Sequence, residues 1–459
     1  MRFTLGKPIL VMVLLSVVGA AALLLAPSRR HADLVAWVFA DVHARAYRDA
    51  ASAFQKKTGR TVQINLITDK ALDVRLTSLF MSSKTAGETP DAVEVEINSV
   101  GRYFRPSVQD IGFLPLNDYI NRSGLCDRIP QSRLAPWTKD GMIFGVPHDV
   151  HPVSITFRDD LFREAGLDLA SAKTWPDFHD KCLAFQRYWS GRGVRYRHAM
   201  ELHEANADDL IVMLLQRHVN LIDDQNRVHV NDAKVLDTLL FYVQLMAGPR
   251  RIGAPSSVNI SGVWVKDLLS GNLCALFTPD WRAVYVRQQA TELSGRLRMM
   301  PLPRFDPDDA PTSTWGGTMI GIPRRCADPD AAWNLIEFLY FSREGLAAQL
   351  RETNVLPAVT TEWDKPVFHQ PDAFYGGQKV FELYVDLARQ IPPRYVAPAT
   401  TLAALELSYV LNRAVRYARD RGTPGLREEC GRWLDAAAND VRRRIRHAQF
   451  DLRADEAVQ

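Results

Sequence analysis

Residues 34–67 read LVAWVFADVHARAYRDAASAFQKKTGRTVQINLI, and this stretch predicts a strand, a helix and a second strand. Residues 34–39 are apolar over the length of a buried strand. From about residue 43 to residue 57, Tyr47, Ala50 and Phe54 recur on one helical face, and Thr58-Gly59 ends the pattern. Residues 62–67 then alternate between apolar and polar side chains. Two strands joined by a helix form a β-α-β unit, which predicts a parallel sheet and an α/β fold.

Strands and helices keep alternating along the rest of the chain. Further strands are expected at residues 90–97, 153–157, 273–277 and 318–322, and a tight hairpin with Asp140-Gly141 at its turn. Helices are expected at 159–165, from the N-cap Thr174 onward, at 263–269, at 329–341 and over most of the C-terminal part. A chain of 459 residues is too long for one ordinary core, so we predict two packed lobes.

Composition excludes several classes of protein. With 47% hydrophobic and 24% charged residues, the chain is neither disordered nor collagen-like nor a coiled coil. A net charge of +3 implies no strong field for nucleic acid. The Arg-dense C-terminal part, which includes Arg442, Arg443, Arg444 and Arg446, is interspersed with Asp420, Glu428, Glu429, Asp435 and Asp440. It is typical of a solvated helix face, and contact with lipid headgroups beside an anchored membrane is the alternative. The five cysteines are scattered and odd in number, so at least one thiol is expected to be unpaired or to pair between chains, and we expect them mainly as small buried side chains.

The first 32 residues predict export. Arg2 and Lys7 precede an apolar run from residue 8 to residue 27, and Arg29 and Arg30 follow it. This is the pattern of a signal peptide, but the run is also long enough to cross a bilayer as an uncleaved anchor. Both alternatives place the folded body outside the cytoplasm, in the periplasm or an equivalent compartment.

Several short motifs occur in one order along residues 34–357. They are FQKKTGRTV at 54–62, PDAV at 90–93, GFLPLNDYI at 112–120, DGMIFGVP at 140–147, RDDLFREAGL at 158–167 with TWPDF at 174–178, GNLCALF at 271–277 with Asp280-Trp281, and Trp315-Gly316-Gly317 with the AAW of residues 331–333. Together they resemble the extracellular solute-binding proteins of ABC importers, specifically the sugar-binding family that includes maltose-binding protein. Phe157-Arg158 departs from the family's usual Tyr-Asn, and no lipid-attachment cysteine follows the apolar run.

The resemblance implies a two-lobed periplasmic-binding-protein fold of type II, with hinge strands between the lobes and the solute in the cleft. The first lobe is expected to comprise residues 33–147 and 304–343, and the second 148–303 and 344–459. The implied function is capture of a sugar or polyol by cleft closure and its delivery to the permease of an ABC transporter. We expect a monomer with no cofactor and no catalytic activity.

We expect contacts to the solute where strands end, because ligands of open α/β sheets bind beyond the carboxyl ends of strands. A sugar needs flat aromatic surfaces for its C–H faces and paired polar groups for its hydroxyls. The aromatic candidates are Trp37, Trp281 and Trp315; Trp175, Trp333 and Trp433 lie in helical patterns and are expected in the core. The polar candidates are Asp41, His43, Glu96, Asn98, His148, Asp149, His151, Glu201, His203 and Asp280, with Gly316 and Gly317 beside Trp315.

Other interpretations compete at some of these positions. Asp41 could instead cap the first helix, and each tryptophan could pack in the core. His148 and His151 have the spacing of a metal pair, but no third ligand clusters with them in the sequence, so we expect no metal. Two other functions remain open, a binding protein for another solute such as a polyamine or ferric ion, and a secreted glycoside-acting enzyme with paired carboxylates.

Overall fold

The computed structural model describes residues 12, 15–16, 32–81, 89–105, 107–256 and 262–456. The predicted export signal or membrane anchor, residues 1–32, therefore lies outside the described residues except at positions 12, 15, 16 and 32. Within the described part of the chain, none of the helices combines the length and the apolar character needed to pass through a bilayer.

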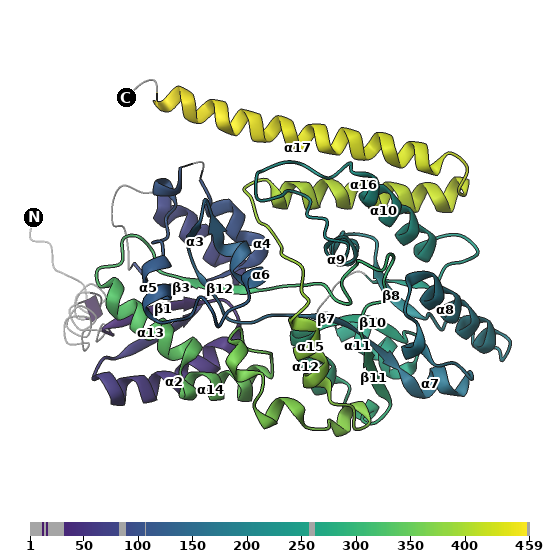
Figure 1. The fold of residues 1–459 in the computed structure, drawn as a ribbon, viewed down its shortest axis with the longest axis horizontal. Coiled ribbons are helices and arrows are strands. Elements are labelled where there is room, and N and C mark those ends of the chain that lie inside the picture. Colours follow the sequence, from purple (N-terminus) through teal and green to yellow (C-terminus); the bar gives the residue numbers. More distant parts are fainter. Residues whose placement is uncertain are drawn as a thin grey trace, which may run out of the picture.

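The first lobe is built on a five-stranded sheet with strand order β2-β1-β3-β12-β6 (Figure 1). β1 pairs in parallel with β2 and β3, as the β-α-β pattern predicts, while β12 lies antiparallel between β3 and β6. The strands are β1 (Leu34–Val38), β2 (Val62–Leu66), β3 (Ala92–Glu96), β6 (Val146–Pro147) and β12 (Thr318–Gly321). The helices around them are α2 (Asp41–Thr58), α3 (Asp69–Met81), α4 (Ile97–Val100), α5 (Asn117–Arg122), α6 (Gln131–Leu134), α13 (Pro329–Phe341) and α14 (Arg343–Thr353).

The predicted hairpin is present beside this sheet. β4 (Thr138–Lys139) and β5 (Met142–Ile143) pair antiparallel across Asp140 and Gly141. Both turn residues have positive φ, 50° and 76°, as a two-residue hairpin turn of this kind requires.

The second lobe holds a smaller antiparallel sheet of order β10-β7-β11 and a parallel pair, β8 with β9. Thr174 accepts a hydrogen bond from the Asp177 backbone N–H and caps α8, as predicted. The strands are β7 (Val153–Arg158), β8 (Met200–His203), β9 (Gly253–Ser256), β10 (Ala275–Pro279) and β11 (Leu297–Met300). The helices are α7 (Asp159–Glu164), α8 (Trp175–Ser190), α9 (Asp208–Gln216), α10 (Ala233–Met246), α11 (Gly262–Ser270), α12 (Asp280–Gln289), α15 (Val380–Ala388), α16 (Thr400–Arg421) and α17 (Leu426–Glu456).

Three segments link the two lobes, which confirms the predicted two-lobed architecture. Residues 148–152 join β6 to β7, residues 301–317 join β11 to β12, and residues 354–379 join α14 to α15. They lie against one another, because Pro152 bridges to Thr314 and Asp149 bridges to Pro357. The predicted lobe boundaries stay a proposal, and the packing of α14 along α2 argues for placing residues 343–353 with the first lobe.

The C-terminal helices α16 and α17 form a layer over α10 of the second lobe, at the top of Figure 1. The approach to this layer also contacts the first lobe. Arg394 donates from Nη2 to Asn98 Oδ1 at 2.7 Å, and Thr401 Oγ1 donates to the Asn98 carbonyl at 3.0 Å. Asn98 belongs to α4, so this contact joins the lobes beside the second linking segment, whose Thr314 and Trp315 line the same small cavity as Asn98 and Arg394.

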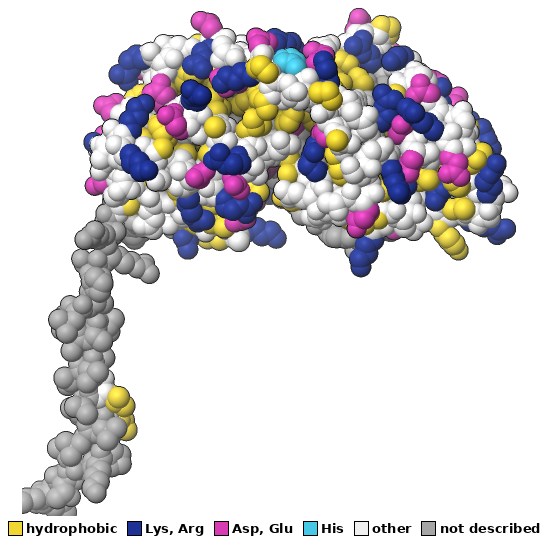
Figure 2. All heavy atoms as spheres, turned by 90° about the horizontal axis from the view of Figure 1, so that it is seen from below, with side chains coloured by type: hydrophobic (Ala, Val, Ile, Leu, Met, Phe, Trp, Pro, Cys, Tyr) yellow, Lys and Arg dark blue, Asp and Glu magenta, His cyan; other side chains and the backbone are white. Residues whose placement is uncertain are grey.

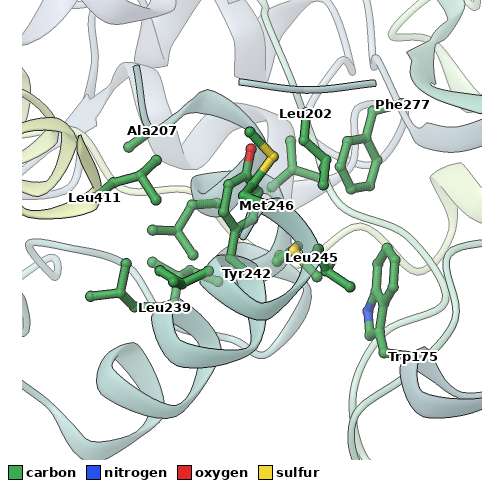
Figure 3. Packing of buried hydrophobic residues seen from close by; sticks show 14 of the residues in the cluster. Trp175, Leu202, Ala207, Leu239, Tyr242, Leu245, Met246, Phe277 and Leu411 are labelled. Atoms are coloured by element: carbon green, nitrogen blue, oxygen red, sulfur yellow. The ribbon is translucent and has the colours of Figure 1, made fainter. Parts of the chain in front are cut away.

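The largest apolar core fills the second lobe (Figure 3). Trp175 is fully buried there, and its indole N–H donates to Gln216 Oε1 at 3.0 Å. Trp333 is buried in the first lobe, as expected, whereas Trp433 is only partly buried beside Tyr417 on the outer helices. All five thiols are free and only Cys126 escapes full burial, in line with the expectation of small buried side chains.

Candidate functional site

A cavity of about 300 Å³ lies between the lobes, where the molecule is hollowed between its two halves (Figure 2). One side is formed by the first lobe, at the start of α2 and the end of β3, and the other by α12 of the second lobe. The linking segments close its base. The lining residues are Phe39, Ala40, Val42, His43, Glu96, Asn98, Asp149, His151, Trp281, Val284, Tyr285, Gln288, Trp315, Gly316, Gly317, Thr318, Thr353 and Val355.

The first-lobe wall is mixed: Phe39, Ala40 and Val42 are apolar, and Glu96 is its acidic group. β3 ends at Glu96, whose carboxylate accepts hydrogen bonds from the backbone N–H and the side-chain amide of Asn98 at 2.7 and 3.1 Å. Burial raises the pKa of Glu96 to about 7, against the opposing charge of Arg394. Near neutral pH, Glu96 is therefore partly ionised and partly protonated. The ionised carboxylate only accepts hydrogen bonds, whereas the protonated carboxyl can also donate one.

The second-lobe wall is aromatic. Trp281 stands edge-on to Trp315 with ring centroids 5.8 Å apart, and edge-on to Tyr285 at 6.2 Å. The indole N–H of Trp281 donates to the Trp315 carbonyl at 2.9 Å, which fixes the plane of its ring. Positions 281, 285 and 288 share one face of α12, so Gln288 extends the same wall with an amide.

Two glycines let the second linking segment pass close to this wall. Gly316 and Gly317 have φ values of 88° and 143°, which side chains with a Cβ rarely adopt. A Cβ on Gly316 would lie 3.1 Å from Trp281 Nε1, and one on Gly317 would lie 2.7 Å from Arg133 Nη2. The cleft therefore depends on the missing side chains at both positions.

A buried polar network runs beneath the cavity. At one end, His43 Nδ1 lies 3.2 Å from Glu94 Oε2 in the first lobe. The His43 ring then packs on His148 with centroids 4.2 Å apart, and His148 Nδ1 lies 3.0 Å from Asp149 Oδ2. Burial lowers the pKa of His43, but the facing Glu94 carboxylate more than offsets this and raises it overall.

The network continues into the second lobe through His151. Its Nε2 lies 2.9 Å from Asp149 Oδ2, and its Nδ1 lies 2.5 Å from Asp280 Oδ1 at the start of α12. Arg133, fully buried, donates to the Asp149 carbonyl at 3.2 Å and to Thr314 Oγ1 at 3.0 Å. One connected set of charges thus reaches from β3 across the linking segments to α12.

One group in this network has the spacing of a possible cation site. His43, His148 and Asp149 offer ligand-type atoms that all lie within 4.8 Å of one another. In the structure Asp149 already accepts from His148 and His151 and faces the Arg133 guanidinium at 3.5 Å. His148 and His151 do not face each other as a metal pair, because each is directed at a carboxylate.

Nine of the fifteen predicted contact residues come together around the cavity. They are His43, Glu96, Asn98, Asp149, His151, Trp281, Trp315, Gly316 and Gly317. Asp280 and His148 do not line it but hold lining residues in place, since they are hydrogen-bonded to His151 and Asp149. Contact with a solute stays a prediction for all of these residues.

Four predicted residues lie elsewhere. Glu201 and His203, predicted as polar contacts to the solute, belong to strand β8 and are buried. Glu201 pairs with Arg282, and His203 pairs with Asp209 and lies edge-on to Trp315. Their charges are neutralised inside the protein, so a polar appearance in the sequence did not indicate exposure.

Trp37 and Asp41 lie on other parts of the first lobe. Trp37 is buried in the core, with the Arg75 guanidinium over its ring. Asp41 is exposed in the first turn of α2 and forms an ion pair with Arg45. The predicted cap at Asp41 is wrong, because the N-cap position is occupied by Ala40.

Several lining residues were not singled out from the sequence. The helical spacing from Trp281 to Tyr285 and Gln288 could have found two of them. Thr353 and Val355 come from the end of α14 and the segment after it, and no local pattern connects them to the cleft. Phe39 follows β1 directly and was visible only as the end of an apolar run.

Comparisons with known proteins identify the family and the fold. A family model described as bacterial extracellular solute-binding protein matches residues 49–374. An arabinooligosaccharide-binding protein of Halalkalibacterium halodurans is 21% identical over 387 residues, which cover 82% of this chain and 83% of the relative. A lactose-binding protein of Rhizobium radiobacter is 22% identical over 386 residues, covering 81% and 86%.

Solved structures show the same fold. The sugar-binding protein MalE from Xanthomonas citri superposes with a TM-score of 0.72 at 20% identity, covering 90% of this chain and 99% of that one. A binding protein of Bifidobacterium animalis subsp. lactis in complex with β-1,6-galactobiose gives a TM-score of 0.68 at 17% identity, covering 90% and 98%. The match over most of the sequence and the shared two-lobed architecture lead to one conclusion: the chain belongs to the bacterial extracellular solute-binding protein family.

Proposed function

We propose that this protein captures a sugar or polyol outside the cytoplasmic membrane and delivers it to the permease of an ABC transporter. The observation that carries the proposal is the composition of the cavity, which combines aromatic rings, mainly on the α12 side, with carboxyl, amide and imidazole groups, mainly on the first-lobe side and the linking segments. Aromatic rings cover the C–H faces of a sugar, and paired polar groups bind its hydroxyls. The names of the two curated relatives, which refer to arabino-oligosaccharides and lactose, support the same class of solute.

The mechanism follows from the position of the cavity. Because residues of both lobes line it, a bound sugar contacts both and stabilises the arrangement in which they are close. The permease would recognise that closed arrangement. No catalytic step is required, and the protein acts as a monomer in the periplasm or an equivalent compartment, tethered there if residues 1–32 stay attached.

The size of the cavity bears on which sugar is bound. A volume of about 300 Å³ is at the lower end of the range for ligand pockets. A second cavity of about 130 Å³ shares Asn98 and Trp315 with it. We therefore expect one or two sugar rings to be enclosed, with a longer chain extending past Asn98.

Calorimetry across a ligand panel tests the proposal. The panel contains arabinose, arabino-oligosaccharides, lactose and maltose, together with spermidine and ferric citrate as members of the competing solute classes. We expect saturable binding of at least one sugar and none of the cation or the iron complex. Tight binding of spermidine or ferric ion without any sugar binding would refute the assignment, and release of a shortened sugar during incubation would point to an enzyme.

A further inference from the structure

His151 has an unusual backbone conformation at the point where the linking segments meet. Its φ is 55°, in the left-handed region that a side chain with a Cβ disfavours, and it is buried. Strained residues of this kind persist only where surrounding contacts hold them. The contacts around His151 are those of its imidazole ring and the bridges on either side of it, from Asp149 to Pro357 and from Pro152 to Thr314.

Both ring nitrogens of His151 face carboxylates, Asp149 at Nε2 and Asp280 at Nδ1. A neutral imidazole has only one N–H, and an ionised carboxylate accepts hydrogen bonds but donates none. Both bonds can form together only if the ring carries two protons and a positive charge. The geometry therefore assigns His151 as an imidazolium between two carboxylates.

Asp280 connects this ring to the aromatic wall. Its Oδ1 also accepts from the Trp281 backbone N–H at 2.8 Å, and its Oδ2 accepts from the Leu356 N–H at 2.9 Å. His151 thus joins the first linking segment to the start of α12 and, through Asp280, to the third linking segment. Trp281 follows directly, and its indole reaches Trp315 on the second segment.

We propose that His151 is a positioning residue for solute binding, whose charged ring holds Asp280 and thereby sets Trp281 and Trp315 at the wall of the cleft. The binding experiments for this role rest on the proposed function, because they need a sugar ligand. The charge on His151 can be measured without any ligand. Nothing in the sugar itself needs to contact the imidazole for this role.

The proton on His151 makes this arrangement sensitive to pH. Burial lowers the pKa of His151, but Asp149 and Asp280 outweigh burial and raise it to about 9. The other titratable and charged groups of the same network are His43 from α2, which interacts with His151, and His148 and the α6 residue Arg133, which both pair with Asp149. Because the pKa of His151 is raised in the folded protein, its ring is fully protonated below the ordinary histidine pKa of 6.5. The hydrogen bonds to both Asp149 and Asp280 are then complete, and this arrangement is lost as pH rises through 9.

The expected change in affinity follows from the protonated fraction. If only the protonated form binds, the apparent Kd rises as that fraction falls, so at pH 10 it should be about tenfold higher than at pH 7. His151→Asn removes the charge and keeps a residue that tolerates positive φ. This variant should bind about tenfold or more weakly at pH 7 and should show no further loss between pH 8 and pH 10.

His218→Asn is the matched control. His218 also has positive φ, 60°, but it is exposed and its imidazole lies 3.3 Å from the Asp308 carbonyl, among residues that do not line the cleft. It should keep the wild-type affinity and the wild-type pH profile. A wild-type profile in His151→Asn, or the same loss in both variants, would overturn the proposal.

A ligand-free measurement separates this proposal from the choice of solute. An NMR titration of the histidine imidazole groups should show one signal that titrates near pH 9. This signal should be absent from the spectrum of His151→Asn. In Asp280→Asn, which serves if the first variant does not fold, the same signal should move to a lower pH. Titration of His151 at the ordinary histidine pKa would refute this role of His151 even if sugars bind. So would a stoichiometric metal whose removal alone abolishes the pH dependence of affinity.

Discussion

Trp281 offers the sharpest test of the aromatic wall. It is partly buried at the edge of the second-lobe core, and one side of its ring lines the cavity. Removing an aromatic ring that stacks on a sugar should weaken binding about 30- to 1000-fold, which is about 2–4 kcal/mol. We expect Trp281→Ala to show this loss in calorimetry while its melting temperature changes little.

Trp433→Ala is the matched control for this prediction. Trp433 is also partly buried, but it packs with Tyr417 and Arg413 on the C-terminal helices. This variant should lose stability without losing affinity. If Trp281→Ala unfolds at much lower temperature and retains affinity in its folded fraction, Trp281 is a core residue.

Glu96 should make stability depend on pH near neutrality. Its folded pKa of about 7 lies above the ordinary value of 4.5, so the acid form is favoured by folding. The contribution of protonated Glu96 to the free energy of unfolding is fully present below pH 4.5 and is lost as pH rises through 7. The amide of Glu96→Gln cannot ionise, so at pH 8.5 we expect the free energy of unfolding of this variant to be about 1–3 kcal/mol larger than that of the wild type.

Urea unfolding at pH 5, 7 and 8.5 would measure this difference. Glu344→Gln, at an exposed position in α14, provides the control and should leave the pH profile unchanged. Equal curves for Glu96→Gln and the wild type at pH 8.5 would show that the Glu96 carboxyl ionises at little cost in the folded protein.

The linking segment that contains Gly316 can be tested against a glycine of similar geometry. Gly316 and Gly377 have φ values of 88° and 84°, but only Gly316 has atoms near the position of an added Cβ, those of Trp281 and His151. Alanine at either site should cost about 1 kcal/mol of stability through the backbone alone. Gly316→Ala should in addition weaken sugar binding about tenfold, because Trp281 must move.

Gly377→Ala should leave affinity intact, and calorimetry with parallel melting curves would compare the pair. If both variants bind like the wild type, the second linking segment has enough freedom to accept the methyl group. The wall would then be less rigid than its hydrogen bond to Trp315 indicates.

Sequence patterns located most elements because strands and helices follow local periodicity, and the strand ends then indicated much of the cleft. The failures involve partners far away in the chain. Met200–His203 alternates apolar and polar residues, yet the strand is buried because Arg282, 81 positions beyond Glu201, neutralises its carboxylate. Arg133 and Leu356 reach the network under the cleft from distant segments for the same reason, and no local pattern could have placed them there.

Closure of the whole molecule is a further expected outcome. A compact chain of this length has a radius of gyration of about 23 Å, and bringing the lobes together should reduce the measured value. Small-angle scattering at saturating sugar should show that reduction in the wild type. Trp281→Ala at the same sugar concentration should scatter like the ligand-free protein, and an unchanged radius in the saturated wild type would contradict closure.

The position of β12 has a consequence for how the chain is made. The strand at Thr318–Gly321 lies between β3 and β6, so the first sheet stays incomplete until synthesis has passed residue 321. β3 and β6 both end by residue 147. Until β12 has been made, the edges of β3 and β6 that pair with it have no partner strand. Pairing across so long a stretch of chain is slow because of the loop that must close. We therefore expect the first lobe of the nascent protein to stay incompletely folded until most of the chain has been translated, which is a state that a translocation channel accepts.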